Sequence, residues 1–554
     1  MRSAEFDVVV IGSGAAGLRA AISAAEAGRS VCVVSKGAPG KSTCTGFSAG
    51  VMAGSAGESQ RDSHRERTLT AGRGLNAGRL VGILVDEAPL RFHELLQWGI
   101  HADLTDGYLY AKGRPPVLGE EIVHCLLKRN VALGTHFWGR LLVADILPGS
   151  DGVGVGAFEK PSGQRVALAA RAVVVATGGA SALYLRTDNP RAILGDGYRL
   201  ALKAGAVLQD MEFVQFYPLC LFEPGSTPLV IPPRLADRGR LINDDGEEIL
   251  EKYGIAERPA AERARDLLSR ALFKEVYRDR RNVGLDLRRL SEDDWRVDPF
   301  AAALRSLLCK RYGAEKRPLR VAPAAHHTMG GARTDAVGAT SVPGLFAAGE
   351  AAGGLHGANR MGGNALSEAL VFGARAGRAA AEWAGRSQVG DSPRLLKALA
   401  EAARRWTNGA SVDAGLKERL QKIMWEEGGI MRSAQGLARA LAAVQEIQQE
   451  ASRPSSELSG RELIGLVELR SAAGVAGTIL EAASRRQESR GAHFREDFPD
   501  QDDAQWQGHL QVRLVSGGGK TWQFEPLTHA ARPIESGADD PGSGRRQWWL
   551  PPPR

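Results

Sequence analysis

Three glycines near the N-terminus limit this chain to a narrow set of folds. Gly12, Gly14 and Gly17 follow the apolar run 6–11 and precede the alanine-rich, helix-like stretch 18–27. In a β-turn-α-β unit the first glycine allows the tight turn, and the second lets the backbone approach a pyrophosphate. The third lets the helix pack closely on the sheet. The pattern therefore predicts an α/β fold with a dinucleotide at the start of the first helix.

The cysteines argue for a reducing compartment. The chain has five cysteines, an odd number, which lie far apart and are never spaced as CxxC: Cys32, Cys44, Cys125, Cys220 and Cys309. The pattern argues against a disulfide framework, a zinc or other metal site, an iron–sulfur cluster on the chain, and a dithiol-using reductase. The net charge of +7 is small for 554 residues, and no basic run is interleaved with aromatics, so nucleic-acid binding is not expected.

We also expect a cytoplasmic protein. The first strand begins near residue 6, which leaves no room for a signal peptide. No apolar run approaches the roughly 20 residues that span a bilayer, so direct membrane insertion is not expected. The protein would reach the inner face of a membrane only through a partner.

The length predicts roughly three domains, because one hydrophobic core seldom serves more than about 300 residues. Further apolar strands, each followed by glycine, indicate that the nucleotide-binding domain is discontinuous. A charged, irregular region interrupts it, a helical bundle follows, and the chain ends in an extension with a flexible Gly/Pro-rich tail. The predicted divisions are 1–215 plus 330–385, 216–329, 386–498 and 499–554.

A second motif lies far from the first. The segment 356–366 (HGANRMGGNAL) places a fixed cation, Arg360, beside flexible glycine backbone and a helix start near Asn364. This arrangement suits an enzyme that holds a carboxylate against a flavin. With the N-terminal motif, it resembles the succinate dehydrogenase/fumarate reductase flavoprotein family, which includes L-aspartate oxidase, from about Asp7 to about Trp506. The resemblance implies a Rossmann-like FAD-binding domain, an inserted α+β capping domain and a C-terminal helical domain.

The family likeness favours FAD over NAD. The acidic ribose partner expected after the second strand is replaced by Ser35-Lys36, a pair that the family often carries. Thr43 occupies the place where some members attach flavin through a histidine, so the cofactor is expected to be non-covalent. For each turn the alternative is an ordinary α/β connection, and for the helix after Asn364 it is packing on the sheet. The implied cofactor-binding residues are Gly12, Ser13, Gly14, Ala16, Gly17, Ser35, Lys36, Ser42, Thr43, Ala49, Gly50, Thr177, Gly178, Asp196, Glu350, Arg360, Asn364, Ala365 and Leu366.

The same resemblance implies the reacting groups. Arg360 offers a planar fork for a substrate carboxylate, with a solvated surface arginine as the alternative. His326 corresponds to the substrate-binding histidine; with His327 it could instead be a metal fragment, although no third ligand is near in sequence. Arg265 corresponds to the proton donor, unless it is a helix-surface residue paired with Glu262 or Asp266. The implied catalytic residues are Arg265, His326 and Arg360, and the implied substrate-binding residues are Tyr217, His326, His356 and Arg360.

Two departures from the family pattern affect the substrate. Tyr217 stands where the family has a histidine that grips one carboxylate. Ile231-Pro232 replaces a Thr-Glu pair that binds substrate and relays protons. One end of the pocket is therefore expected to be more apolar and to lack its relay, unless Arg234 or Asp237 compensates.

The sequence thus predicts an FAD-dependent oxidoreductase that passes hydride between flavin N5 and the CH–CH or C=C of a carboxylic acid, succinate/fumarate by default. The alternatives are an amino-acid oxidase of the L-aspartate type and a flavoprotein that serves in electron transfer or assembly. The segment 488–499 is a family signature, expected to fasten the helical domain to the flavin domain. Residues 502–506 continue like the respiratory-complex members, which implies an iron–sulfur partner subunit.

Overall fold

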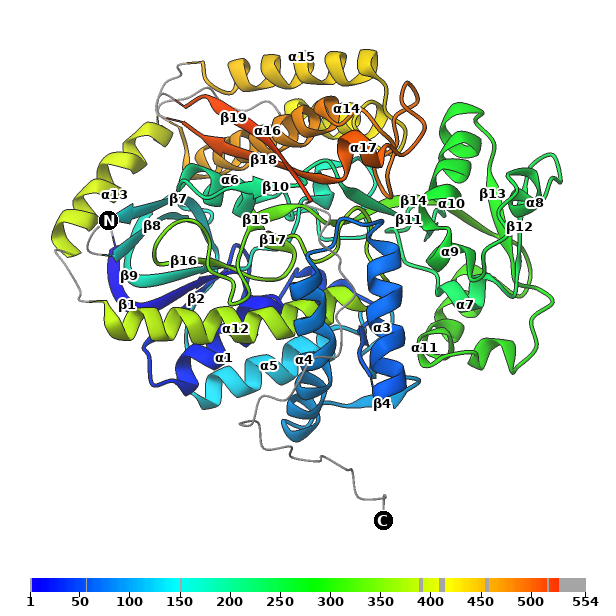
Figure 1. Ribbon diagram of the computed structural model, residues 1–554, viewed down its shortest axis with the longest axis horizontal. Helices are drawn as coiled ribbons and strands as arrows, with labels where there is room; N and C mark the ends of the chain where they lie inside the picture. The colour runs from blue at the N-terminus through cyan, green and yellow to red at the C-terminus, as the bar shows by residue number, and fades with distance from the viewer. Residues whose placement is uncertain are drawn as a thin grey trace.

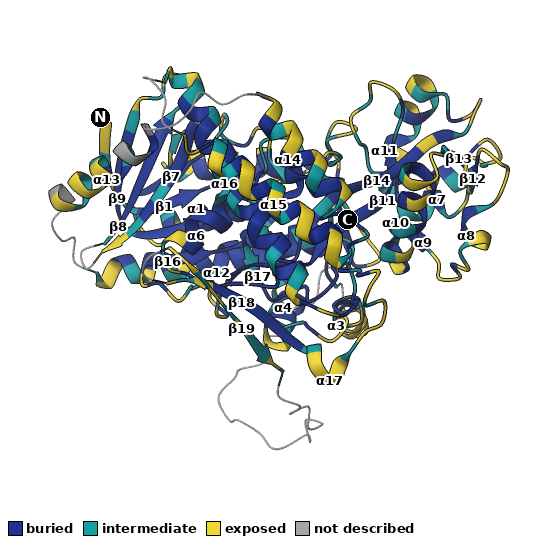
Figure 2. Ribbon diagram, turned by 90° about the horizontal axis from the view of Figure 1, so that it is seen from above, coloured by how far each residue is buried: buried dark blue, intermediate teal, exposed yellow. Residues whose placement is uncertain are grey.

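The computed structural model describes residues 2–527, except 56, 150–151, 388–391, 408–413, 454–457 and 516–517. The predicted flexible tail, about 530–554, lies outside the described residues. The chain forms a large body with a lobe on one side (Figures 1 and 2).

The body is built on a seven-stranded sheet. Its strands follow the order β6-β2-β1-β9-β8-β7, and β16 also pairs with β9. All neighbours in β6-β2-β1-β9 and the β9–β16 pair are parallel, whereas β7 and β8 are antiparallel. The strands are β1 (Arg2–Ile11), β2 (Val31–Val34), β6 (His136–Trp138), β7 (Leu141–Gly149), β8 (Gly152–Glu159), β9 (Arg165–Val175) and β16 (Leu345–Ala347).

Continuous apolar runs explain the parallel part of this sheet. Val8–Ile11 and Val31–Val34 are buried on both faces, as parallel strands covered by helices require. Helices α1 (Ala15–Glu26) and α12 (Asn364–Arg386) lie against one face (Figure 1). They pack closely because Gly373 has no side chain: a Cβ there would lie only 2.6 Å from the Ala16 carbonyl oxygen. A strand and a helix from beyond residue 340 thereby join the N-terminal β-α-β unit.

The lobe contains a four-stranded antiparallel sheet in the order β11-β14-β13-β12 (right in Figure 1). The helical part of the lobe is interrupted at Ala264, which has φ −113° and ψ 34°. Two α-helices and a π-helical turn, Lys274–Arg278, result. The elements are β11 (Val214–Leu221), α7 (Pro233–Ala236), β12 (Arg240–Asn243), α8 (Ile249–Lys252), α9 (Ala260–Arg263), α10 (Arg265–Phe273), β13 (Val283–Asp286), α11 (Pro299–Ser306) and β14 (Leu319–Thr328).

Two smaller sheets connect distant parts of the body. One has the order β17-β15-β10-β18-β19 and the other β3-β5-β4. Part of the predicted C-terminal extension is therefore a hairpin that adds to the body. The strands are β3 (Val51–Ala53), β4 (Ala102–Thr105), β5 (Tyr108–Ala111), β10 (Leu208–Gln209), β15 (Gly331–Arg333), β17 (Ala352–Gly353), β18 (Gly508–Leu514) and β19 (Lys520–Pro526).

The remaining helices surround the body. They are α2 (Cys44–Phe47), α3 (Glu58–Ala71), α4 (Gly78–Gln97), α5 (Glu120–Ala132), α6 (Asp196–Lys203), α13 (Ser392–Thr407), α14 (Ala414–Glu426), α15 (Ala434–Glu450), α16 (Gly460–Arg485) and α17 (Asp503–Trp506). Contrary to the sequence expectation, α16 is long and apolar enough to cross a bilayer by length and composition. However, 78% of its apolar window is buried inside the protein, as in a core helix.

Buried ion pairs connect the signature segment 488–499 to the rest of the body. Glu488 Oε1 lies 2.9 Å from Arg486 Nη1, and Arg486 Nε lies 2.6 Å from Glu212 Oε1. All three side chains are inaccessible to solvent. These contacts join the end of α16 to the segment before β11, the fastening role expected for this signature.

Candidate active site

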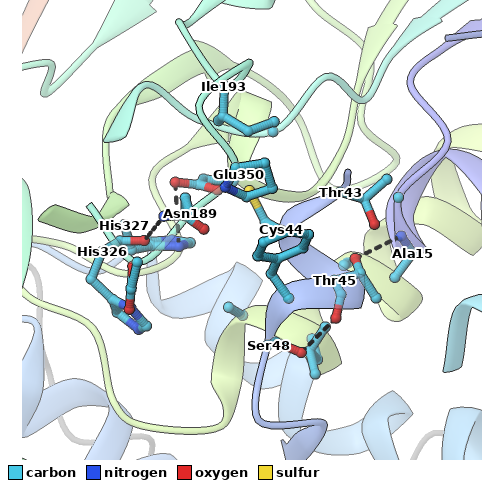
Figure 3. Close-up of a pocket in the computed structure, with 18 of the residues that line it drawn as sticks. Ala15, Thr43, Cys44, Thr45, Ser48, Asn189, Ile193, His326, His327 and Glu350 are labelled. Atoms are coloured by element: carbon cyan, nitrogen blue, oxygen red, sulfur yellow. Dashed lines mark hydrogen bonds and ion pairs between the residues drawn. The ribbon is translucent and has the colours of Figure 1, made fainter. Parts of the chain in front are cut away.

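A cavity of about 1070 Å³ extends from the carboxyl ends of β1, β2 and β9 to the lobe. It is larger than most pockets for drug-sized ligands, which have volumes of about 300–1,000 Å³. In Figure 3, Ala15, Thr43 and Thr45 lie on one side, His326 and His327 lie on the other, and Cys44 and Glu350 lie between them. The position at the carboxyl edge of a parallel sheet is typical of nucleotide sites.

The glycine turn shapes one end of the cavity. Gly12 has φ +121°, and a Cβ there would overlap the Ala176 carbonyl oxygen. A Cβ at Gly17 would overlap the Gly12 carbonyl oxygen, so this glycine serves the turn itself and does not line the cavity. Gly14 caps α1 without a side-chain hydrogen bond. The helix start is thus shaped to accept a phosphate on its backbone amides.

Beside the turn, several predicted cofactor residues line the cavity. Lys36 Nζ lies 2.8 Å from Asp196 Oδ2, so these two side chains form an ion pair with each other. The Thr177 hydroxyl is buried at the cavity with no hydrogen-bond partner in the described chain. Together with the glycine turn, this unpartnered group fits a dinucleotide such as FAD. Predicted cofactor residues that line the cavity are Gly12, Ser13, Gly14, Ala16, Ser35, Lys36, Ser42, Thr43, Ala49, Thr177, Gly178, Asp196, Glu350, Arg360, Ala365 and Leu366.

The N-terminus of α12 forms another part of the wall. Gly363 caps it at φ +86°, and Ala365 and Leu366 line the cavity. Asn364, expected at the cofactor, does not line it; its amide bonds to His64 and Thr68 at 2.7 and 2.9 Å. Anchoring of Asn364 fixes the start of the helix, whose positive end then faces the cavity. Gly50 is the other predicted cofactor residue, besides Gly17 and Asn364, that does not line it.

Arg360, His326 and Asp188 form a hydrogen-bonded chain at the far end. Arg360 Nη2 lies 2.7 Å from His326 Nε2, and His326 Nδ1 lies 2.6 Å from Asp188 Oδ2. When Nδ1 donates to Asp188, Nε2 is free to accept from Arg360. Burial lowers the pKa of His326, as do Arg360 and Arg265, while Asp188 opposes the shift. This favours the neutral imidazole that the chain requires.

The guanidinium of Arg360 is buried away from water, so a ligand carboxylate could accept the hydrogen bonds that water would otherwise accept. Its side chain is buried, and Nε has no hydrogen-bond partner among residues that the structure describes. Burial, followed by the charge of Arg265, lowers the pKa of Arg360 to about 9. An anion beside these two guanidinium groups would offset both the loss of hydration on burial and the repulsion between the two positive charges. The solvated alternative for Arg360 is wrong.

Arg265 begins α10 and is only 4% exposed. Its Nε donates to the Ala261 carbonyl oxygen at 3.1 Å, and its guanidinium carbon lies 5.3 Å from the Tyr217 ring centroid. Burial lowers its pKa, and Nη1 lacks a partner within the described residues. Asp266 pairs with Arg270 at 3.9 Å, so the predicted alternative of a surface pair does not describe Arg265.

Tyr217 is buried, but its hydroxyl is already used. The hydroxyl donates to the Ile231 carbonyl oxygen at 2.6 Å. Tyr217 and Ile231 are 2% and 0% exposed and belong to one hydrophobic cluster. Tyr217 lines the cavity, whereas Ile231 and Pro232 do not; of the two residues that could compensate, Arg234 lines it and Asp237 does not.

Glu350 lies between the two ends of the cavity. Its Oε1 accepts from the Thr328 amide at 2.9 Å and lies 3.5 Å from His327 Nδ1. Burial raises the pKa of Glu350 to about 7. Its carboxylate is therefore partly protonated near neutral pH.

His356, predicted to bind substrate, does not line the cavity. Its Nε2 lies 2.9 Å from Glu368 Oε2, and both side chains are buried. Folding also brings this pair to His327, giving three candidate metal-ligand atoms within 4.8 Å of one another. The fold therefore brings two candidate ligand groups, His356 and Glu368, to His327, whereas His326 takes no part in this group.

Sequence reasoning missed Asp188. Nothing near it in the sequence marks it as a partner of His326, which lies 138 positions away. Asn189, beside it, donates to the His326 carbonyl oxygen at 2.7 Å, so the two segments are fixed together by backbone as well as side-chain contacts. Only the fold reveals this pairing.

Comparisons with known proteins agree with this geometry. A family model described as an FAD binding domain matches residues 7–366, and one described as the fumarate reductase flavoprotein C-terminus matches 417–536. One component of the fumarate reductase (CoM/CoB) of Methanothermobacter marburgensis is 34% identical, with 90% of this chain and 95% of that protein aligned. The L-aspartate oxidase of Streptomyces coelicolor is also 34% identical, over 95% of this chain and 96% of that protein. A solved E. coli quinol fumarate reductase chain has a TM-score of 0.85 at 29% identity, covering 96% of this chain and 98% of that one.

Proposed function

Because this chain belongs to the succinate dehydrogenase/fumarate reductase flavoprotein family, which includes L-aspartate oxidase, we propose that it interconverts a carboxylic acid and its α,β-unsaturated counterpart. The protein is an FAD-dependent oxidoreductase. Succinate and fumarate are the reference pair, since fumarate appears in the names of several relatives.

The observation that carries the proposal is the group of side chains at the far end of the cavity. Arg360, His326 and Arg265 line one cavity together with the glycine turn. Two guanidinium groups there have nitrogens without partners among the described residues. A carboxylate would satisfy them by charge-assisted hydrogen bonds.

Each residue then has a distinct task. Arg360 binds the carboxylate, and His326, oriented by Asp188, fixes the guanidinium and contacts the ligand. Arg265 moves the proton at the carbon next to the carboxylate, helped by a pKa lowered by burial. The glycine turn, with Ser35, Lys36, Ser42 and Thr43, would hold FAD, which would supply hydride exchange when bound.

We infer that FAD is held non-covalently, because Thr43 carries no group that attaches flavin. Its hydroxyl instead caps α2 by accepting from the Gly46 amide at 3.1 Å. Denaturation in trichloroacetic acid should release all of the flavin into the supernatant. Yellow colour that stays with the precipitated protein would contradict this.

The enzymatic proposal is tested by anaerobic reduction of the purified holoprotein with a dye, followed by unsaturated acids. We expect the flavin absorbance near 450 nm to recover with at least one 2-enoic acid and not with the saturated acid. A flavin that reoxidises with oxygen but with no unsaturated acid would contradict the proposal.

A second candidate is an amino-acid oxidase, since L-aspartate oxidases are among the relatives at equal identity. Oxygen consumption and ammonia release with L-aspartate would favour it. In either case we propose a cytoplasmic protein; for the first candidate we propose that an iron–sulfur partner protein, which carries electrons, holds it at the inner face of a membrane. Co-purification of such a partner from the native host tests this part.

A further inference from the structure

We propose that the cavity selects a monocarboxylic acid with an uncharged, apolar substituent at the far carbon, and that it discriminates against dicarboxylates. This inference rests on the proposed function and names the substrate class of the same site. It depends on how charge and apolar surface are distributed along the cavity.

Two guanidinium groups with unpartnered nitrogens, among the described residues, lie close together. Arg265 Nη2 lies 3.5 Å from the position that a Cβ would take at Gly362, two residues after Arg360. His326, the third member, bonds directly to Arg360. One carboxylate placed here would meet both guanidinium groups.

Beside this clamp, which consists of Arg360, Arg265 and His326, the cavity wall carries apolar side chains as well as a few charged ones. The Tyr217 and His326 ring centroids lie 5.7 Å apart, so Tyr217 stands directly beside the clamp. Its hydroxyl is satisfied by Ile231, so it has no proton left to donate to a second carboxylate. Cavity-lining residues of the same hydrophobic cluster as Tyr217 are Val51, Tyr110, Leu229, Val230 and Phe300.

The charged side chains on this wall do not favour an anion. Arg234 lines it, but so do the carboxylates of Glu262 and Asp298. Arg234 also lies 4.0 Å from Asp106, and the Tyr108 hydroxyl accepts from Arg67 at 2.7 Å. Arg186 also lines the cavity, but its guanidinium donates to the Pro323 and Leu221 carbonyl oxygens at 3.3 and 3.5 Å. A second carboxylate would lose hydration and would meet Glu262 and Asp298 as well as Arg234, whereas each buried methylene would improve binding about fourfold.

Binding to the oxidised holoprotein tests the inference independently of turnover. Succinate, butanoate and hexanoate would be titrated in by calorimetry and by the shift in the flavin spectrum. We expect hexanoate to bind at least tenfold more tightly than succinate, with butanoate between them. Equal or tighter binding of succinate would overturn the inference.

Turnover separates the two proposals. Dye-reduced protein would be mixed with fumarate, trans-2-butenoate or trans-2-hexenoate. Faster reoxidation by the monocarboxylates supports both proposals, whereas faster reoxidation by fumarate overturns the substrate class and leaves the proposed function standing. If no acid reoxidises the flavin, the proposed function fails, and the binding titration still decides the ligand class.

A matched pair of variants tests the role of Tyr217. Tyr217→His places a nitrogen donor beside the clamp and should shift the ratio of succinate to hexanoate affinity at least tenfold toward succinate. Tyr217→Phe removes only the hydroxyl bonded to Ile231, so its affinity ratio should stay within about threefold of the wild-type ratio. Flavin content confirms folding of each variant. If the His variant keeps the original ratio, or the Phe variant acquires a preference for succinate, this account of the selectivity is wrong.

Discussion

The two ends of the cavity are built in different ways. At the dinucleotide end, Gly12 and Gly14 present backbone, and a single added Cβ at Gly12 would overlap the neighbouring strand end at Ala176. At the clamp, Arg360, His326 and Asp188 present side chains from separate segments joined by short hydrogen bonds. Binding at the first end depends on the space left by absent side chains. Binding at the second end depends on the charge of the side chains and on the hydrogen bonds that position them.

This difference predicts different failures. Changes that add atoms at the backbone end should remove the cofactor and destabilise the fold together. Changes at the clamp should leave a folded yellow protein that binds acids poorly.

The largest effect is expected from Gly12→Ala. The added Cβ would collide with the Ala176 carbonyl oxygen, and φ +121° is strained for any residue with a side chain. We expect less than about a tenth of the wild-type flavin content per purified chain, measured by absorbance. Gly474→Ala is the matched control, because nothing lies within 4 Å of its Cβ and it lies inside α16; it should keep full flavin content.

Next is Arg360→Lys, which keeps the charge but loses the planar fork. We expect normal flavin content and a fall in kcat/KM of at least about 100-fold, roughly 3 kcal/mol of transition-state stabilisation. Arg288 offers a control, because it is half exposed and pairs with Asp286 rather than lining the cavity. Arg288→Lys should change kcat/KM less than twofold. Loss of flavin in the Arg360 variant would contradict the proposal that the clamp binds the acid without contributing to cofactor retention.

Glu350, between the ends, gives a pH effect. Because its pKa in the folded protein is about 7 against an ordinary 4.5, the native state holds a proton that the unfolded state has lost between these values. Stability of the FAD-free protein should therefore fall as pH rises from about 4.5 to 7, by up to roughly 3 kcal/mol. Urea unfolding at pH 5 to 8 should show a shallower decline for Glu350→Gln. Parallel curves would contradict the buried, protonated carboxyl.

The smallest effect is expected from Asp188→Asn, which keeps shape but removes charge. Asp188 opposes the lowering of the His326 pKa, so its loss should lower that pKa further. Without the carboxylate beside Nδ1, the imidazole should also be held less firmly in one tautomer. We expect about a tenfold fall in kcat/KM with unchanged flavin content. An unchanged kcat/KM and pH profile would show that Asp188 does not position His326.

Sequence and structure agree where constraints are local. The β-α-β unit and the start of α12 near Asn364 were predictable from apolar runs and glycine turns. The break at Ala264 and the folded hairpin β18–β19 were not, because both depend on neighbours distant in the chain. His356 shows the same limit: its motif indicated substrate, whereas burial pairs it with Glu368 from the next helix.

The sequence by itself determined the dinucleotide end, because a positive φ and absent side chains at Gly12 are properties of a few adjacent residues. It also predicted that Arg360 and His326 meet in one site, and the structure places them 2.7 Å apart at the cavity. Only the tertiary structure decided that Asp188 orients His326 and that the Tyr217 hydroxyl is bonded to Ile231. The first contact depends on how the lobe packs on the body, because Asp188 and His326 are far apart in sequence. The second depends on the segment after β11 folding back on that strand, where the Ile231 amide donates to the Leu219 carbonyl oxygen at 2.9 Å.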